Sequence, residues 1–256
     1  MEAAALDRAM ATDRASGKYQ PFLVVGSVGA TPSGIIDPLA EVGEVCRKHK
    51  AWFHLDAPWG GIAAFSPDLK KRCLAGLEFA DSLTFDPHKT LVPLGAGGAG
   101  MFLSRHRDSV ARAFNVSGVD VAPHDYAYLS LQGSRVNSGL RVLTAILRPA
   151  ELAARVAREA ALGDQLRAML RQAGWEIVND TPLPVVCAIH PAMRSGAFSA
   201  EDAVDYLDLE GVLAKPEALR PNEPHALRLG LISRQTDAHS LSYVVERLGK
   251  FVAERS

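Results

Sequence analysis

The sequence lacks several features that mark particular classes of protein. It has no apolar run long enough to cross a membrane. Its first twenty residues mix acidic and basic side chains, without the hydrophobic block of a signal peptide. The net charge is only −1, so no excess of positive charge indicates nucleic acid or an anionic membrane surface as a partner. We therefore expect a cytoplasmic protein that binds neither.

Cysteine is also scarce. The three cysteines, Cys46, Cys73 and Cys187, are odd in number and form no C-x-x-C pair. They fit neither a disulfide framework nor a thiol-based metal or redox motif. We expect buried, unreactive thiols in a reducing compartment.

What the sequence does have is enough apolar residues for a substantial core. Of its 256 residues, 48% are hydrophobic and 22% are charged, a balance typical of globular proteins. This length suits one large domain, or a large and a small one.

The first half of the chain alternates strands with helices. Apolar, β-branched runs predict strands at 22–28, 51–57, 81–86 and 96–104, and helical spacing predicts helices at 3–16, 38–50 and 67–80. This order is typical of a mainly parallel sheet in an α/β domain, with the first two strands buried on both faces. The short gap between residues 86 and 96 instead favours a hairpin-like connection.

The second half of the sequence has a different pattern of predicted elements. Residues 105–134 are rich in loops, and a long helix follows from about 138 to 172, which Pro149 is expected to kink or divide. Beyond Gly174, the segments WEIVND, PVVCAIHP and ALRLGLIS predict strands, whereas AEDAVDYLDLEG and HSLSYVVERLGKFVAE predict helices. We expect a small α+β domain here.

Lys89 stands in ADSLTFDPHKTL (80–91), just beyond a predicted strand. Most lysines in such a place are solvated surface charges. Here Asp86, His88 and Lys89 crowd together next to apolar Phe85, and a partly desolvated lysine can attack a carbonyl group. Pyridoxal phosphate, held as a Schiff base, is the obvious carbonyl partner.

Asp56 in HLDAPWGG also falls at the end of a predicted strand. It can cap a helix or complete a turn, but a pyridoxal cofactor needs a carboxylate against its ring nitrogen. Ligands of open α/β sheets lie beyond the carboxyl ends of the strands, so Asp56 and Lys89 could face one crevice. We expect His54 to be structural and to point away from Asp56, and we expect no metal site.

The segment PLGAGGAG (93–100) is rich in glycine. It can be a flexible turn between strands, or it can let backbone amides approach a phosphate. It matches neither a Walker loop nor a dinucleotide-binding motif, so it favours neither interpretation strongly.

Four segments together resemble the pyridoxal-phosphate-dependent group II amino acid decarboxylases, the family of aromatic amino acid, glutamate and diaminobutyrate decarboxylases. They are VVGSVGATPSGIIDPLAEVGEVC (24–46), WFHLDAPWGG (52–61), FADSLTFDPHKTL (79–91) and SRVNSGLRVL (134–143). The resemblance implies the type I fold of pyridoxal-phosphate-dependent transferases. Residues 1–136 would be the C-terminal part of the cofactor-binding large domain, 137–172 a connecting helix and 173–256 a small α+β domain.

The resemblance also implies roles for individual residues. Lys89 would form the Schiff base and Asp56 would pair with the pyridine nitrogen. The other residues implied to lie around the cofactor are His88 near its phosphate or ring, Thr31 near cofactor or substrate oxygens, Ala57 against the ring face and Asp86 near the phosphate. Arg135 would be supportive. Tyr126 and Tyr128 are candidates for the loop tyrosine that returns a proton after carbon dioxide leaves, although packing roles are open for both.

Two departures from the family stand out. Where family members have Ala-Ala after the ring-pairing aspartate, this chain has Ala57-Pro58. The first strand that can be aligned also belongs in the middle of the family's large domain, and no histidine precedes His49. We expect the dimer-forming segment, the phosphate loop and the ring-stacking histidine to be missing from this chain.

The function implied by the resemblance is decarboxylation of an L-amino acid to an amine, by a homodimer with pyridoxal 5'-phosphate. We expect full activity to depend on an N-terminal half that this chain lacks. Two alternatives remain: other pyridoxal chemistry on the same scaffold, such as transamination, lyase or aldehyde-forming activity, and a non-catalytic remnant or partner subunit.

Overall fold

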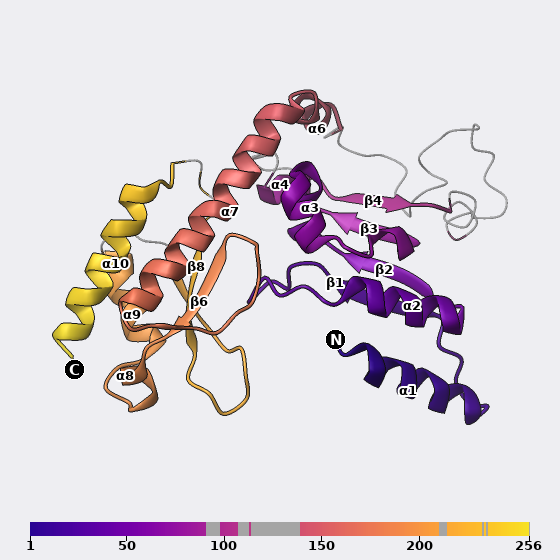
Figure 1. The fold of residues 1–256 in the computed structure, drawn as a ribbon, viewed down its shortest axis with the longest axis horizontal. Helices are drawn as coiled ribbons and strands as arrows, with labels where there is room; N and C mark the ends of the chain where they lie inside the picture. Colours follow the sequence, from indigo (N-terminus) through magenta and orange to yellow (C-terminus); the bar gives the residue numbers. More distant parts are fainter. Residues whose placement is uncertain are drawn as a thin grey trace. The chain divides into compact units, whose positions relative to one another are not determined.

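The structure, a computed structural model, describes residues 1–90, 98–106, 113, 139–209, 214–231, 233 and 235–255. The chain divides into two compact units, coloured along the sequence in Figure 1. The first comprises Met1–Gly26, Asp37–Ile62 and Ala75–Pro149, and the second comprises Ser27–Ile36, Ala63–Leu74 and Ala150–Ser256. Tyr126, Tyr128 and Arg135 lie outside the described residues.

The first unit is built on a four-stranded sheet in the order β1-β2-β3-β4 (Figure 1). Its strands are β1 (Leu23–Ser27), β2 (Trp52–Asp56), β3 (Ser82–Phe85) and β4 (Met101–Ser104). β2 and β3 are parallel, and β4 runs antiparallel to β3, which confirms the predicted hairpin-like connection. The short helix α4 (Pro87–Thr90) follows β3 directly.

Two helices of this unit pack against each other: α1 (Ala3–Ala15) and α2 (Leu39–His49). α2 turns Val42 and Cys46 inward, four residues apart on one face, and it also contacts β2. Asp7 of α1 binds Lys48 and His49 at 2.7 and 2.6 Å. The hydrogen bonds from Lys48 and then His49 lower the pKa of Asp7 below its ordinary value.

The expectation that the first two strands are buried on both faces is wrong for the described residues. In β1, Val24 is buried, whereas Leu23 and Val25 are each 46% exposed. In β2, Phe53 and Leu55 are buried and Asp56 is exposed. Successive side chains of a strand point to opposite faces, and in β1 and β2 only the residues of one face are buried. An apolar run predicts a strand, but it does not indicate which faces of that strand are covered.

The predicted helix at 67–80 is shorter in the structure. α3 spans Pro67–Cys73, and the single 3-10 turn η2 (Leu77–Phe79) follows after a break. Gly76 causes that break with a φ of 99°, a left-handed conformation that a helix cannot contain. A further 3-10 helix, η1, spans Gly60–Phe65.

Substituting Gly76 tests this packing. A Cβ at Gly76 would lie 2.3 Å from the backbone nitrogen of Ala40 at the start of α2, and its φ would remain left-handed. We expect Gly76→Ala to lower the free energy of unfolding by about 3 kcal/mol, measured by urea denaturation. Gly17→Ala is the matched control, because Gly17 also has a positive φ, 66°, but open space around its Cβ position. It should cost about 1 kcal/mol. Equal losses in the two variants would contradict the steric argument.

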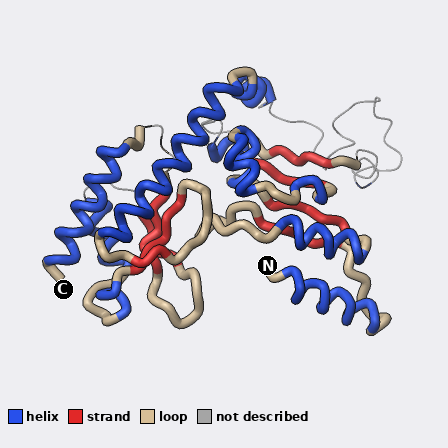
Figure 2. Tube along the Cα trace, in the orientation of Figure 1, coloured by secondary structure: helices blue, strands red, loops and turns tan. Residues whose placement is uncertain are grey.

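The second unit contains an antiparallel sheet in the order β5-β6-β8-β7. Its strands are β5 (Glu176–Ile177), β6 (Val185–Ile189), β7 (Ala214–Glu217) and β8 (Ala226–Gly230). The strands of this sheet are drawn in red in Figure 2. Every residue of β6, which lies between β5 and β8, is buried. Pro216 lies in β7, the edge strand, where proline is tolerated; the sequence interpretation missed this strand.

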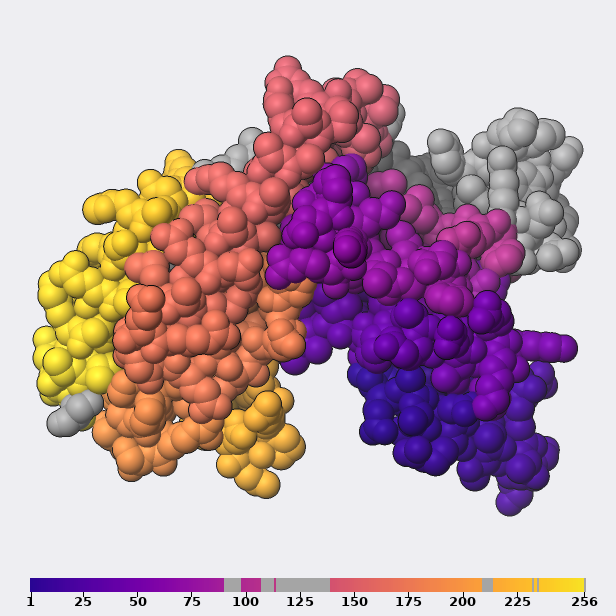
Figure 3. Space-filling view, viewed as in Figure 1, coloured from indigo at the N-terminus to yellow at the C-terminus, as the bar shows by residue number. Residues whose placement is uncertain are grey.

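The helices of the second unit are α3, α7 (Pro149–Gln172), α8 (Pro191–Arg194), α9 (Ala200–Leu209) and α10 (Ala238–Ala253). α9 packs on β7 and β8 and contacts α10. In Figure 3, α7 in salmon and α10 in yellow occupy much of the visible face of this unit. Helix α6 (Gly139–Ile146) ends shortly before Pro149, so the prediction that this proline divides the long helix is confirmed.

All three cysteines are buried, as predicted. Burial raises the pKa of each thiol, Cys46, Cys73 and Cys187, to about 11. Thiols of this kind are mostly protonated near neutral pH and react slowly. No helix in the described part of the chain is both long and apolar enough to span a membrane.

Candidate cofactor site

Asp56 is placed by the pairing of two parallel strands. It is the last residue of β2, and in the register of the sheet it lies opposite Thr84 of β3. The hydroxyl of Thr84 donates a long hydrogen bond of 3.4 Å to Asp56 Oδ1, and the carboxylate is exposed. Because parallel strands end at the same edge of a sheet, the segments that follow β2 and β3 emerge together.

Lys89 lies in α4, on the segment that follows β3. Its Nζ is 3.2 Å from Asp86 Oδ2, and its side chain is 40% exposed. The backbone N–H of Lys89 donates to Asp86 O at 3.0 Å, so the same aspartate holds the turn of chain and the amine. The contact partner of the amine is thus a carboxylate rather than a cation, and the amine remains open to solvent.

Ala57 and Pro58 join the two strand ends. The N–H of Ala57 donates to Thr84 O at 3.2 Å, and the N–H of Asp86 donates to Pro58 O at 3.0 Å. The proline that departs from the family pattern therefore uses its carbonyl to hold the Asp86 segment, and it needs no N–H at this place. Ala57 is 2% exposed. A Cβ at nearby Gly61 would come within 2.8 Å of the Phe85 ring, which shows how closely this loop packs on β3.

His88 turns toward the glycine-rich segment. Its Nδ1 lies 2.9 Å from Ala99 O and 3.2 Å from Ala99 N, so it contacts that backbone in either tautomer. A Cβ at Gly98 would come 3.5 Å from His88 Nδ1, and one at Gly100 would come 3.4 Å from Asp86 Oδ1, which are ordinary contact distances. Residues 91–97 of that segment are outside the described residues.

The expectation that His54 points away from Asp56 is wrong. Residues two apart in a strand share a face, and Trp52, His54 and Asp56 alternate with buried Phe53 and Leu55. His54 Nδ1 is 2.8 Å from Ser82 Oγ, and its ring stacks on Phe102 at 5.9 Å. Burial lowers the pKa of His54, partly offset by the charge of Asp56.

Comparison with known proteins identifies the scaffold. Residues 1–189 match the model described as the pyridoxal-dependent decarboxylase conserved domain. The chain belongs to the pyridoxal-dependent decarboxylase family. The predicted family, its type I fold and its cofactor, pyridoxal 5'-phosphate, are thereby confirmed at the level of the family.

Curated relatives match this chain over shorter stretches. Aromatic-L-amino-acid decarboxylase of Mus musculus is 39% identical over 119 residues, which are 46% of this chain and 24% of that protein. Acidic amino acid decarboxylase GADL1 of Xenopus tropicalis is 49% identical over 72 residues, 28% of this chain and 14% of that protein. The similarity is thus concentrated in part of the chain.

Solved structures share the fold of this chain over nearly its whole length. The Rhodiola rosea 4-hydroxyphenylacetaldehyde synthase has a TM-score of 0.85 at 20% identity, covering 100% of this chain and 54% of that one. Catharanthus roseus tryptophan decarboxylase, in complex with L-tryptophan, has a TM-score of 0.84 at 22% identity, covering 99% of this chain and 54% of that one. The chain therefore spans about half the length of these structures.

The predicted site residues are divided between the two units of the chain. Asp56, Ala57, Asp86, His88 and Lys89 all belong to the first unit, on the strand ends described above. Thr31 belongs to the second unit, where it is an exposed residue of a tight turn. Tyr126 and Tyr128 lie outside the described residues, so their roles stay predictions.

Sequence reasoning missed Thr84. It lies beside Asp56 in the register of β2 and β3, and both its side chain and its carbonyl take part in the site, through Asp56 and Ala57. The signal was present, because Thr84 stands two residues before Asp86 on the same predicted strand. Its importance can be recognised only when the register of β2 and β3 is known, and a single sequence does not specify that register.

A hollow of about 730 Å³ opens elsewhere in the first unit. It is lined by residues that include Trp52, Asp81 and His106, near the amino ends of β2 and β3. Ligands of parallel sheets lie at the opposite, carboxyl ends, where Asp56 and Lys89 are found. We therefore place the candidate site at the strand ends and not in this hollow. Among the described residues, no group of three or more His, Cys, Asp or Glu side chains could hold a metal ion.

Proposed function

We propose that this chain binds pyridoxal 5'-phosphate through Lys89 and Asp56 and serves the decarboxylation of an L-amino acid to its amine. The observation that carries the proposal is the placement of an accessible amine and an exposed carboxylate after two adjacent parallel strands. These are the two groups that the cofactor requires, one for its aldehyde and one for its ring nitrogen. Their chemistry therefore fits the group.

Each residue would have a distinct task. Lys89 Nζ would hold the cofactor covalently, and Asp86, 3.2 Å away, would orient that amine. The Asp56 carboxylate would keep a proton on the ring nitrogen, and Thr84 would fix the direction of that carboxylate. Ala57, small and buried, would leave space for the ring face, and His88 would lie near the phosphate or ring. The cofactor itself supplies an electron sink for the pair left when carbon dioxide departs.

The proposal extends to the complete protein. We propose an L-amino acid substrate, a homodimer and a cytoplasmic location, with residues 1–136 as part of the large domain, 137–172 as the connecting helix and 173–256 as the small domain. The relatives named as amino acid decarboxylases support the substrate class. The low net charge is in keeping with a small-molecule substrate rather than nucleic acid. Tyr126 or Tyr128 would return a proton to the carbon that lost carbon dioxide.

A second function, aldehyde formation, has one observation in its favour. The solved structure from Rhodiola rosea is named as a 4-hydroxyphenylacetaldehyde synthase and shares this fold. Product analysis separates the two outcomes, because decarboxylation yields an amine and carbon dioxide, whereas the alternative yields an aldehyde.

The test is a titration of the purified chain with pyridoxal phosphate. Binding is followed by visible absorbance, then fixed with borohydride, and the labelled peptide is mapped by mass spectrometry. We expect saturable binding and one label per chain on Lys89. Label spread over many surface lysines, or no saturable binding, would refute the proposal for this chain.

Asp56→Asn should weaken cofactor binding without moving the label. The substitution keeps the shape of the side chain but removes the charge that would pair with the protonated ring nitrogen. Hydrogen bonds to charged groups contribute about 1.5–3 kcal/mol, so we expect the dissociation constant of pyridoxal phosphate to rise roughly 10- to 100-fold. The titration described above measures it, and peptide mapping should still find Lys89 labelled.

The matched control is Asp205→Asn, which removes an exposed carboxylate from α9 in the other unit. It should leave the dissociation constant unchanged. An Asp56→Asn variant that binds the cofactor as tightly as the parent chain would remove Asp56 from the proposed site.

A further inference from the structure

Ser82 of β3 bonds to two side chains of the neighbouring strand. In the register of the sheet it lies opposite His54 of β2, and Trp52 stands two residues before His54 on the same face. Trp52 Nε1 donates to Ser82 Oγ at 2.8 Å, and His54 Nδ1 lies 2.8 Å from the same oxygen. Ser82 is only 4% exposed. One buried hydroxyl therefore joins the two rings.

The direction of these two bonds follows from the chemistry of the groups. An indole N–H can only donate, so Ser82 Oγ accepts from Trp52. The hydroxyl has one proton to donate, and among the described residues His54 Nδ1 is the only acceptor that it contacts. A buried donor without an acceptor is costly, so this proton is directed to Nδ1. A neutral imidazole that accepts at Nδ1 carries its own proton on Nε2.

The surroundings of His54 also favour the neutral ring. It stacks on Phe102 of β4, at 5.9 Å between ring centroids. Burial lowers the pKa of His54, and the charge of Asp56 opposes this only in part. A protonated ring could not accept the Ser82 proton at all, because both of its nitrogens would be donors. Asp56 therefore has a neutral histidine rather than a cation two residues away on its own face.

We propose that Ser82, oriented by Trp52, holds His54 as a neutral imidazole, and that His54 is thereby a positioning residue that keeps the Asp56 carboxylate available to the cofactor ring. This inference rests on the proposed function, in which Asp56 pairs with the protonated ring nitrogen. A cationic His54 would compete with that nitrogen for the carboxylate and would also repel it. All four residues belong to the first unit.

Two further titratable groups lie close to this cluster. His106 stands beside Trp52, at 5.0 Å between ring centroids, and its Nε2 is 2.8 Å from Asp81 Oδ1. The other side chains that the described parts of β1, β3 and β4 contribute to this face are uncharged: Leu23, Val25, Ser27, Thr84, Phe102 and Ser104. His106 and Asp81 are unchanged in every variant below, so a comparison with the parent chain isolates the titration of His54.

The first measurement is nitrogen-15 NMR of the histidine-labelled chain without cofactor, with the His54 signals assigned by their loss in His54→Gln. We expect His54 of the parent chain to be neutral and protonated on Nε2 near neutral pH. Ser82→Ala removes the donor, so the ratio of the Nε2–H to the Nδ1–H form should fall roughly fivefold and the pKa of His54 should rise. Ser82→Thr keeps the hydroxyl and should restore both.

The second measurement compares the pyridoxal phosphate dissociation constants of Ser82→Ala and the parent chain across pH. Above the His54 pKa of both chains the histidine is neutral in each, so the ratio of variant to parent should be near one. Between the two pKa values only the variant carries a cationic His54. We expect the ratio to rise there to roughly threefold and to fall again at lower pH, where both chains carry the cation.

Val42→Ala separates this role from general stability. Val42 is fully buried in α2 of the same unit, and its side chain makes no hydrogen bond. Its truncation should lower the free energy of unfolding without changing the tautomer of His54 or the pH dependence of cofactor binding. If Val42→Ala shifts the His54 signals and the binding ratio as Ser82→Ala does, the effect is one of stability and the inference is wrong.

The remaining outcomes are also decisive. A cationic His54, or one protonated on Nδ1, in the parent chain near neutral pH would overturn the inference. A binding ratio for Ser82→Ala that does not vary with pH would break the link from His54 to the cofactor. If the parent chain does not bind pyridoxal phosphate at all, the proposed function fails and this link fails with it, whereas the NMR result still decides whether Ser82 holds His54 neutral.

Discussion

Lys89→Ala should abolish covalent retention of pyridoxal phosphate after borohydride reduction, lowering the label per chain by at least about 100-fold. The reason is chemical, because only a primary amine can form the reducible bond with the cofactor aldehyde. In α4, Lys89 combines accessibility with a fixed neighbour, Asp86 Oδ2 at 3.2 Å, directly after a strand end. The measurement is intact-protein mass spectrometry, followed by peptide mapping.

Lys250→Ala provides the control for Lys89. Lys250 is also an exposed lysine beside a carboxylate, at 2.7 Å from Glu246. It shares the chemistry of Lys89 but lies in the last turn of a long helix of the second unit, α10, and does not directly follow a strand. Its removal should leave the label unchanged. Full labelling of Lys89→Ala would mean that another lysine can hold the cofactor. Equal loss of label in both variants would mean that the label is not specific to Lys89.

Much of the architecture could be predicted from local sequence signals. The strand ending at Phe85, the hairpin-like return to Met101 and the division of a long helix at Pro149 each follow from a short run of residues. Strands could be predicted well because a short apolar run between turn residues is typical of a buried strand. Helix ends were predicted less well. The predicted helix at 67–80 is interrupted at Gly76, which has a left-handed conformation and leaves no room for a Cβ beside Ala40.

The candidate site, too, could be predicted only in part. Asp56 and Lys89 could be found because each stands at a predicted strand end and because the motifs resemble a known family. Thr84 could not, since its place beside Asp56 depends on register. The bonds that join Ser82 to Trp52 and His54 could not either, because they depend on the same register. Burial of β1 was overestimated because composition does not say which elements cover a face.

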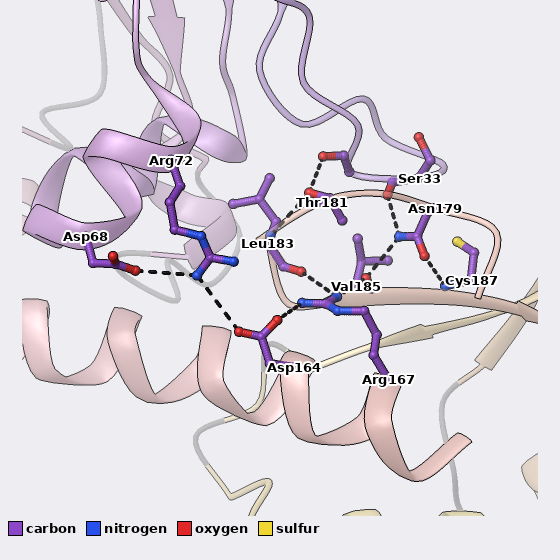
Figure 4. Close-up of polar contacts among 11 residues, drawn as sticks. Ser33, Asp68, Arg72, Asp164, Arg167, Asn179, Thr181, Leu183, Val185 and Cys187 are labelled. Atoms are coloured by element: carbon purple, nitrogen blue, oxygen red, sulfur yellow. Dashed lines mark hydrogen bonds and ion pairs between the residues drawn. The ribbon is translucent and has the colours of Figure 1, made fainter. Parts of the chain in front are cut away.

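Arg167→Ala should cause a large loss of stability in the second unit. Arg167 of α7 is 6% exposed, and its Nη1 donates to Leu183 O and Val185 O at 3.3 and 3.1 Å (Figure 4). Its Nη2 also binds Asp164 Oδ1 at 2.7 Å. Truncation removes these charge-assisted hydrogen bonds and a buried aliphatic stem. We expect the free energy of unfolding to fall by about 3 kcal/mol, measured by urea denaturation.

Two variants separate the sources of that loss. Arg171→Ala, one turn later on α7, removes an exposed arginine and should change stability by less than about 0.5 kcal/mol. Arg167→Met keeps most of the buried stem but none of the donors, so its loss should fall between those of the two alanine variants. If Arg167→Met is as stable as the parent chain, the packing of the stem accounts for the whole effect. The bonds from the guanidinium to the segment that leads into β6 would then contribute nothing measurable, because the desolvation of the charge would offset them completely.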